Sequence, residues 1–222
     1  MNNSAEFYRP PVNQGLDVLY QDHALLVLNK PCSLLSVPGR GTARQDSLAT
    51  RVQKEFPDAE VVHRLDMSTS GVMLMARGKA MQAQLSRLFQ ERRIEKRYIA
   101  VVTGKIKQSH GEIDLPLLCD WPNRPKQKVD SDNGKPALTR FQVLYYDSVN
   151  DTTRVVLTPV TGRSHQLRVH MQQLGHAILG DELYAGDVVA QQAKRLLLHA
   201  ESIAFMHPVT AKKLLLGCEP PF

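Results

Sequence analysis

The stretch V-H-R-L-D-M-S-T-S-G, residues 62–71, is followed directly by the apolar run V-M-L-M-A, residues 72–76. Ser and Thr compete for backbone hydrogen bonds and Gly adds conformational freedom, so residues 68–71 favour a tight loop. The apolar run is typical of a buried strand. We therefore expect an acid, Asp66, and a guanidinium, Arg64, on a loop that a core strand supports. Taken alone, the stretch fits a purely structural Asp–Arg pair equally well.

Patterns on either side of this stretch predict more strands than helices. Helices are expected from Asp46, as a cap, to Pro57, at residues 79–91, and from an N-cap at Ser164 to Gly175. Strands are expected at residues 17–29 (two, around a turn at 21–23), 72–76, 94–103, 138–146, 154–158, 196–205 and 213–217, with a hairpin-type turn at 132–135. This arrangement predicts an α+β fold with a largely antiparallel sheet.

The composition is that of an ordinary globular chain. Its 222 residues, 42% hydrophobic and 23% charged, predict a single domain over residues 16–222, preceded by a flexible arm at residues 1–15. No apolar run approaches the ~20 residues that span a bilayer, and the N-terminus lacks the order of a signal peptide. Three widely spaced cysteines fit a reducing compartment, so we expect a cytoplasmic protein without membrane association.

The positive charge is concentrated in three segments. Residues 87–107 hold seven basic and two acidic residues, residues 121–140 hold five and two, and residues 154–170 hold three arginines and no acid. These segments exceed the net charge of +6 of the whole chain, so the remainder is acidic. Segregated Lys and Arg favour a polyanionic partner, although a merely soluble basic surface is the alternative. We favour a nucleic acid.

The motif H-R-L-D-M-S-T-S-G, residues 63–71, resembles the catalytic motif of the RluA family of pseudouridine synthases. Five further motifs are present in the order in which that family has them, over about residues 16–207: L-V-L-N-K-P (26–31), L-L-S-V-P-G (34–39), K-R-Y-I-A (96–100), T-G-R-S-H-Q-L-R-V-H (161–170) and L-L-L-H-A-E (196–201). One motif would be weak evidence, whereas five in order are specific. The resemblance implies a mixed sheet with flanking helices and a central RNA-binding cleft.

The resemblance also implies an activity. Pseudouridine formation breaks the N-glycosidic bond of a uridine in RNA, turns the base and rejoins it through carbon, which requires no cofactor. The expected substrates are stem-loops, namely a hairpin loop of 23S rRNA and the anticodon loop of certain tRNAs, and we expect a monomer. Larger relatives carry an N-terminal S4 RNA-binding module, for which fifteen residues are too few. The alternatives are a synthase that modifies only one of these RNAs and a non-catalytic RNA-binding protein of the same fold.

Three residues are the candidate catalytic groups. The family's essential carboxylate corresponds to Asp66, as nucleophile or as base. The guanidinium of Arg163, at the start of the predicted helix, is expected to pair with Asp66, although it could instead bind only phosphates. The ring of Tyr98 is expected to stack on the flipped uracil, although an apolar strand also suits a core tyrosine.

Five further residues are candidates for RNA or substrate binding: His63, Arg64, Trp121, Arg124 and Arg168. Arg64 resembles the arginine that fills the gap left by a flipped base. Trp121 lies among Pro, Lys and Arg124, where it could stack on bases or anchor the loop.

The histidines leave room for a hydrolase or a metal site. His165 and His170 are five residues apart, however, and not the four that align two ligands on one helical face. Ser70 and Asp66 could join a distant histidine in a triad, but no G-x-S-x-G elbow is present. We therefore expect no metal.

Overall fold

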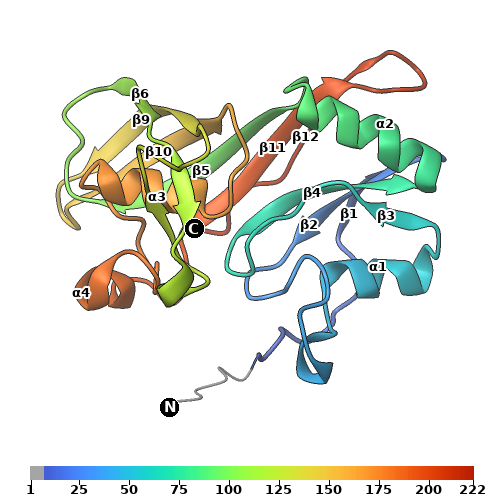
Figure 1. Cartoon of the computed structure of the whole chain (residues 1–222), viewed down its shortest axis with the longest axis horizontal. Coiled ribbons are helices and arrows are strands. Elements are labelled where there is room, and N and C mark those ends of the chain that lie inside the picture. The colour runs from blue at the N-terminus through green and yellow to red at the C-terminus, as the bar shows by residue number, and fades with distance from the viewer. Residues whose placement is uncertain (1–7) are drawn as a thin grey trace.

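A ten-stranded sheet runs through the computed structural model, which describes residues 8–222 (Figure 1). Its order is β1-β2-β4-β11-β5-β10-β9-β6, with β3 paired to β4 and β12 paired to β11, and β7 and β8 form a separate hairpin. Within the described residues, β4 and β11 form the only parallel pair of strands. The predicted α+β fold with a largely antiparallel mixed sheet is confirmed.

The strands are β1 (Val18–Gln21), β2 (Leu25–Lys30), β3 (Ala59–Val61), β4 (Ser70–Arg77), β5 (Glu95–Thr103), β6 (His110–Asp114), β7 (Leu117–Cys119), β8 (Gln127–Val129), β9 (Leu138–Asp147), β10 (Thr152–Pro159), β11 (Leu198–Met206) and β12 (Lys213–Gly217). The helices are α1 (Leu48–Glu55), α2 (Lys79–Gln90), α3 (Gln166–Gln173) and α4 (Gly186–Gln191), with short 3-10 turns at η1 (Thr42–Arg44) and η2 (Trp121–Asn123).

Strands β5 and β11 join two halves of the molecule (Figure 1). Residue Ala200 of β11 pairs with Gly71 of β4 on one side and with Tyr98 of β5 on the other. The loop that carries Asp66 leads directly into β4, so this register places the end of that loop one strand away from Tyr98 of β5.

Each half has its own core. In the half that contains β2, the sheet lies between α1 and α2. Alternate residues of β2 face opposite sides, so that Leu26 and Leu28 face α1 whereas Leu25 and Val27 face α2. In the other half, Leu167 and Met171 of α3 pack on β5 and β10. Tyr98 packs against both the β2–α1 core and the α3 core, so it lies where the two halves meet.

The strands predicted from the sequence are all present, but two helix starts differ. Helix α1 is capped by Ser47 in a capping box with Thr50, while Asp46 instead binds Arg51 at 2.8 Å. Helix α3 is preceded not by a Ser164 cap but by His165, whose left-handed backbone (φ 53°) reverses the chain. No sequence pattern indicated β3, β6, β7, β8 or α4, which are short or exposed.

Part of the predicted flexible arm is attached to the body of the protein. The Tyr8 hydroxyl donates to the Asp46 carbonyl and accepts from the Leu35 amide, both at 3.0 Å, and Arg51 donates to the Pro11 carbonyl. Residues 8–11 are therefore attached to the protein, because Tyr8 and Pro11 form hydrogen bonds with residues in and just before α1. Residues 1–7 of the predicted arm lie outside the described residues.

The predicted turn at residues 132–135 is present, but it does not close a simple hairpin. The Asp130 carboxylate accepts from the amides of Asp132 and Asn133, and Lys135 then bridges back to Leu117.

None of the helices described over residues 8–222 has the length and apolarity to cross a membrane.

Gly71 offers a test of the join between β4 and β11. Its φ is +110°, and an added Cβ would lie 2.2 Å from the Ala200 carbonyl oxygen. We expect Gly71→Ala to lower the free energy of unfolding by about 2 kcal/mol or more, because it adds a clash to the backbone strain. Gly15→Ala is the matched control, since Gly15 also has a positive φ (+95°) but open space around it. Urea denaturation should show the larger loss at Gly71, and equal losses would contradict the tight join.

Candidate active site

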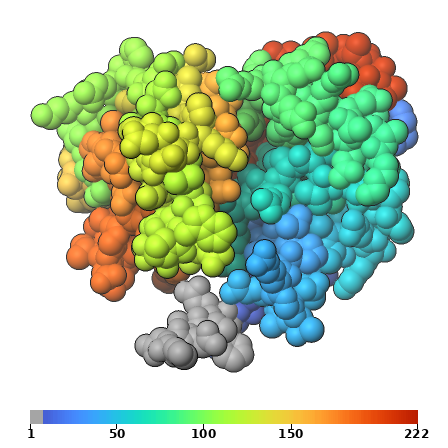
Figure 2. Space-filling model, viewed as in Figure 1, coloured from blue at the N-terminus to red at the C-terminus, as the bar shows by residue number. Residues whose placement is uncertain are grey.

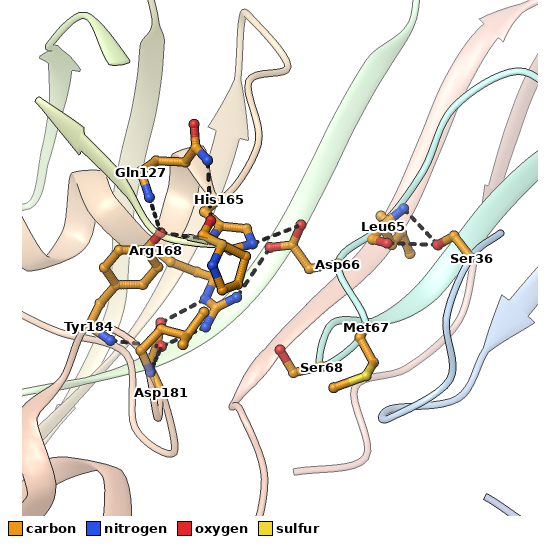
Figure 3. Close-up of polar contacts among 12 residues, drawn as sticks. Ser36, Leu65, Asp66, Met67, Ser68, Gln127, His165, Arg168, Asp181 and Tyr184 are labelled. Atoms are coloured by element: carbon orange, nitrogen blue, oxygen red, sulfur yellow. Dashed lines mark hydrogen bonds and ion pairs between the residues drawn. The ribbon is translucent and has the colours of Figure 1, made fainter. Parts of the chain in front are cut away.

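Asp66 lies on the turn between β3 and β4, where the two halves of the molecule meet. The amide of Thr69 donates to the Asp66 carbonyl at 3.1 Å, which closes the turn. The carboxylate points from this loop toward residues of the opposite half (Figure 3), and its side chain is 26% exposed. An acid in this position is within reach of a substrate and still has fixed partners.

A buried lysine, Lys30, binds the backbone of the Asp66 loop. The Lys30 ammonium donates to the carbonyl oxygens of Pro31 (2.8 Å), Leu34 (2.7 Å) and Met67 (3.0 Å). Burial lowers the pKa of Lys30 to about 7. Because all three donors are used, Lys30 ties β2 to the residue that follows Asp66. This role of Lys30 was not predicted, although a lysine two residues after the apolar run at residues 24–28 was a usable signal.

Two more side chains hold the backbone of the same loop. The Ser36 hydroxyl donates to the Leu65 carbonyl at 2.7 Å and accepts from the Leu65 amide at 3.0 Å (Figure 3). The Cys32 thiol donates to the Ser68 carbonyl at 3.1 Å. The backbone on both sides of Asp66 is thus fixed by side chains from residues 30–36.

The cationic partner of Asp66 is Arg168. Its Nη1 lies 3.5 Å from Asp66 Oδ2, while Nε and Nη2 bind both oxygens of Asp181 at 2.8 and 2.7 Å (Figure 3). Arg168 and Asp181 are almost fully buried. Burial alone would lower the pKa of Arg168, but the hydrogen bond and charge of Asp181 outweigh it and raise the pKa. A charged guanidinium is therefore held permanently beside Asp66.

Arg163, predicted to make that pair, is instead exposed, and its Nε donates to the Pro136 carbonyl at 3.1 Å. The prediction of an Arg163–Asp66 pair is wrong because α3 begins only at Gln166, which leaves Arg163 in the preceding turn. Arg168, predicted to bind RNA, lies in the first turn of that helix and faces Asp66.

Two further polar groups surround the carboxylate. His165 Nε2 lies 3.9 Å from Asp66 Oδ1, and His165 Nδ1 lies 2.6 Å from the Tyr184 hydroxyl. The Tyr184 ring also lies against the Arg168 guanidinium, 5.1 Å from its Cζ. Neither Asp181 nor Tyr184 was identified from the sequence, since they lie more than 110 residues from Asp66 and carry no local signal.

Tyr98 is half-buried and packs against the cores of both halves. Burial, and secondarily the negative charge of Asp66, raise the pKa of its hydroxyl well above the ordinary value. The phenol therefore stays protonated within electrostatic reach of Asp66. The structure brings these two predicted residues together.

The neighbouring residues Arg64 and His63 lie in different environments. Arg64 is exposed on the rim of the loop. His63 packs on Phe89, with 4.6 Å between ring centroids, and its Nε2 accepts from the Leu74 amide at 2.9 Å. Burial, followed by the charge of Lys96, lowers the pKa of His63 to about 3. The ring of His63 therefore anchors β4, and its predicted role in RNA binding stays a prediction.

Trp121 and Arg124 lie at the tip of the β7–β8 hairpin. Trp121 is 65% exposed, and the Arg124 Cζ lies 4.3 Å from the centroid of its ring. Trp121 is therefore not a loop anchor tucked into the core. A stacked Trp–Arg pair on the surface has the composition of a base-stacking platform.

The alternative chemistries find little support in the arrangement. Ser70 does bind a histidine, with 2.8 Å between its Oγ and His199 Nδ1, but His199 Nε2 faces the Cys218 carbonyl and not a carboxylate. Both residues are buried. Over residues 8–222 no cluster of three or more His, Cys, Asp or Glu side chains could hold a metal ion.

Comparisons with known proteins agree with this geometry. Residues 24–173 match the family model described as RNA pseudouridylate synthase. A protein named "Dual-specificity RNA pseudouridine synthase RluA" from Escherichia coli is 55% identical over 203 residues, which cover 91% of this chain and 92% of that protein. The protein of the same name from Yersinia pestis is 54% identical over 92% of this chain and 99% of its own.

A solved structure, "Human RNA Pseudouridylate Synthase Domain Containing 1", superposes with a TM-score of 0.79 at 30% identity, over 96% of this chain and 87% of that one. Sequence identity above one half along nearly the full length and a shared fold lead to the same conclusion as the site. The chain belongs to the RNA pseudouridylate synthase family.

Proposed function

We propose that this enzyme converts uridines in two structured RNAs to pseudouridine, one in a hairpin loop of 23S rRNA and one in the anticodon loop of tRNA. The observation that carries the proposal is the partly exposed Asp66 carboxylate, paired with a buried Arg168 and set beside Tyr98. The dual target is supported by the printed name of the relatives, "Dual-specificity RNA pseudouridine synthase RluA". The enzyme works as a cytoplasmic monomer, without a cofactor.

Each group has a place in the isomerisation. The Asp66 carboxylate acts at the junction of sugar and base, where the N-glycosidic bond breaks and the carbon–carbon bond forms. Arg168 fixes its orientation and balances its charge, so little reorganisation is needed when the flipped nucleotide arrives. The protonated Tyr98 offers a ring face to the uracil. All atoms of the product come from the substrate, so no external group is consumed.

RNA is recognised by exposed cations and aromatic groups around the furrow between the two halves, which Figure 2 shows from the side of the β7–β8 hairpin. Arg64 enters the stack that the target base has left, and the Trp121–Arg124 pair contacts bases of the loop. Arg163 contributes to phosphate binding from its exposed position.

Asp66→Asn tests the chemistry directly. The substitution keeps size but removes charge and nucleophilicity, so we expect no turnover while the melting temperature and stem-loop affinity stay near normal. The cellular arm maps pseudouridines in 23S rRNA and tRNA from cells with and without the gene. Both sites should lose the modification, and the wild-type gene should restore it whereas Asp66→Asn should not. Turnover by the purified variant would refute the role of Asp66, and loss in one RNA alone would refute dual specificity.

Arg168→Lys and Arg163→Lys form a matched pair that separates the two arginines. Lysine keeps the charge but cannot bind Asp181 and Asp66 simultaneously with a planar fork. We expect Arg168→Lys to reduce the single-turnover rate by about a hundredfold or more, since breaking a buried pair costs ~3–5 kcal/mol. Arg163→Lys should react at close to the normal rate. Equal losses in both variants would contradict the assignment of the pair.

RNA binding should depend steeply on salt and on an accessible loop. If about five phosphates are contacted, affinity should fall by roughly three orders of magnitude for each tenfold rise in salt.

A short stem-loop should suffice as substrate, whereas the same uridine in a perfect duplex should react poorly. Arg64→Ala should slow stem-loop turnover more than it weakens binding. Equal rates on loop and duplex, or normal turnover by Arg64→Ala, would refute base flipping.

A further inference from the structure

His165 and Tyr184 form a chain of contacts that ends at Asp66 and begins in the β7–β8 hairpin. The Gln127 amide of β8 donates to the Tyr184 hydroxyl at 2.8 Å, that hydroxyl lies 2.6 Å from His165 Nδ1, and His165 Nε2 faces Asp66 Oδ1 at 3.9 Å (Figure 3). Arg168 approaches the other carboxylate oxygen, Oδ2. The carboxylate is thus bracketed by one group at each oxygen.

We propose that Tyr184 and His165 are positioning residues that orient Asp66 through a directed hydrogen-bond relay and link it to the RNA-facing hairpin. This inference rests on the proposed role of Asp66 as the essential carboxylate. It assigns His165 a function that neither a metal site nor a hydrolytic triad would give it.

The direction of the relay follows from its fixed donor. A backbone amide can only donate, so the Tyr184 oxygen accepts from Gln127. The hydroxyl proton then points to the nearest acceptor, His165 Nδ1. With Nδ1 accepting, the proton of the neutral imidazole is on Nε2 and is directed at Asp66 Oδ1. The other tautomer would face the carboxylate with a lone pair and leave the Tyr184 proton without its acceptor.

The electrostatic surroundings keep both groups in these states near neutral pH. Burial lowers the pKa of His165, outweighing Asp66 and Asp181, which raise it, while Arg168 lowers it further. Burial raises the pKa of Tyr184 to about 12. The imidazole therefore remains neutral and the phenol remains protonated, as the relay requires.

The backbone of His165 indicates that its ring is placed for a purpose. It occupies the left-handed region, at φ 53° and ψ 17°, which is uncommon for residues other than Gly although His, like Asn and Asp, adopts it more often than most, and its side chain makes no cap hydrogen bond to α3. An ordinary serine or aspartate cap would stabilise the helix better. What this conformation provides is a ring that reaches Tyr184 on one side and Asp66 on the other.

The separation of 3.9 Å between His165 and Asp66 is longer than a hydrogen bond. A short movement of the hairpin, transmitted through Gln127 and Tyr184, would close it. The same hairpin carries the exposed Trp121–Arg124 pair. RNA bound at the tip of the hairpin therefore acts on β8, whose Gln127 amide is hydrogen-bonded to Tyr184. Loop recognition and the orientation of Asp66 are coupled in this way.

The test compares three variants on a stem-loop substrate, with single-turnover rate and affinity measured separately. Tyr184→Phe keeps the ring beside Arg168 and removes only the hydroxyl, and His165→Asn keeps a residue suited to the left-handed backbone but loses the reach of Nε2. Both should slow the reaction by about tenfold, with affinity changed by less than about twofold. His165→Gln, which can place an N–H near the position of Nε2, should recover most of the rate although glutamine suits the backbone less well.

Tyr146→Phe is the control for loss of a hydroxyl, because Tyr146 binds Asp151 on the exposed surface. Its rate should be normal. The ring nitrogens of His165 provide a readout independent of activity, since ¹⁵N chemical shifts distinguish a protonated from an unprotonated nitrogen. We expect a proton on Nε2 in the wild-type protein and a mixture of tautomers in Tyr184→Phe.

A proton on Nδ1 in the wild type, a normal rate for Tyr184→Phe, or no recovery with His165→Gln would each overturn the relay. Asp66→Asn is measured in parallel. If that variant turns over, the proposed function itself fails, whereas an inactive Asp66→Asn together with a fully active Tyr184→Phe refutes the relay alone.

Discussion

The site depends on one buried guanidinium. Arg168 is held by both oxygens of Asp181 and extends its remaining nitrogen to Asp66. A buried charge is costly without a full set of partners, and removing one partner of such a pair typically costs ~3–5 kcal/mol. Helix α3 and the segment around Asp181 must therefore be in place before Asp66 finds its partner. The Asp66 carboxylate gains a fixed counter-charge from the half of the molecule opposite to its own.

The register of β11 brings Asp66 close to the half of the molecule that carries Arg168. Ala200 pairs with Gly71 and Tyr98, so the strand after Asp66 and the strand of Tyr98 are separated by a single strand. The Gly71 backbone must pass closer to Ala200 than any side chain would permit. The buried Lys30 then fixes the Asp66 loop against its own half. Sheet register sets the position of Asp66, and the ion pair with Arg168 sets its orientation.

The sequence predicted the elements of this arrangement better than their connections. Local signals, such as an apolar run after Ser68–Gly71, were enough for the strands and for the Asp66 loop, because they depend on neighbouring residues. The choice between Arg163 and Arg168 depended on where α3 begins, and that start is set by the left-handed backbone of His165, which no residue pattern indicates. Asp181 and Tyr184 were missed because only tertiary packing brings them to Asp66. The structural contact of His63 with Phe89 was missed for the same reason.

The residues of the site differ in exposure in a way that fits the proposed use of two RNAs. Arg168, Asp181 and Lys30 are buried and hydrogen-bonded, whereas Arg64, Trp121 and Arg124 are exposed and are the residues that we propose contact RNA. Stacking and phosphate contacts tolerate different base sequences, since every base has a π-face and every nucleotide a phosphate. The buried groups need to meet only the uridine that has left its stack. Under the proposed function, the rigid site meets one flipped nucleotide while the exposed rim contacts the loop around it, so that one active site can act on two stem-loops.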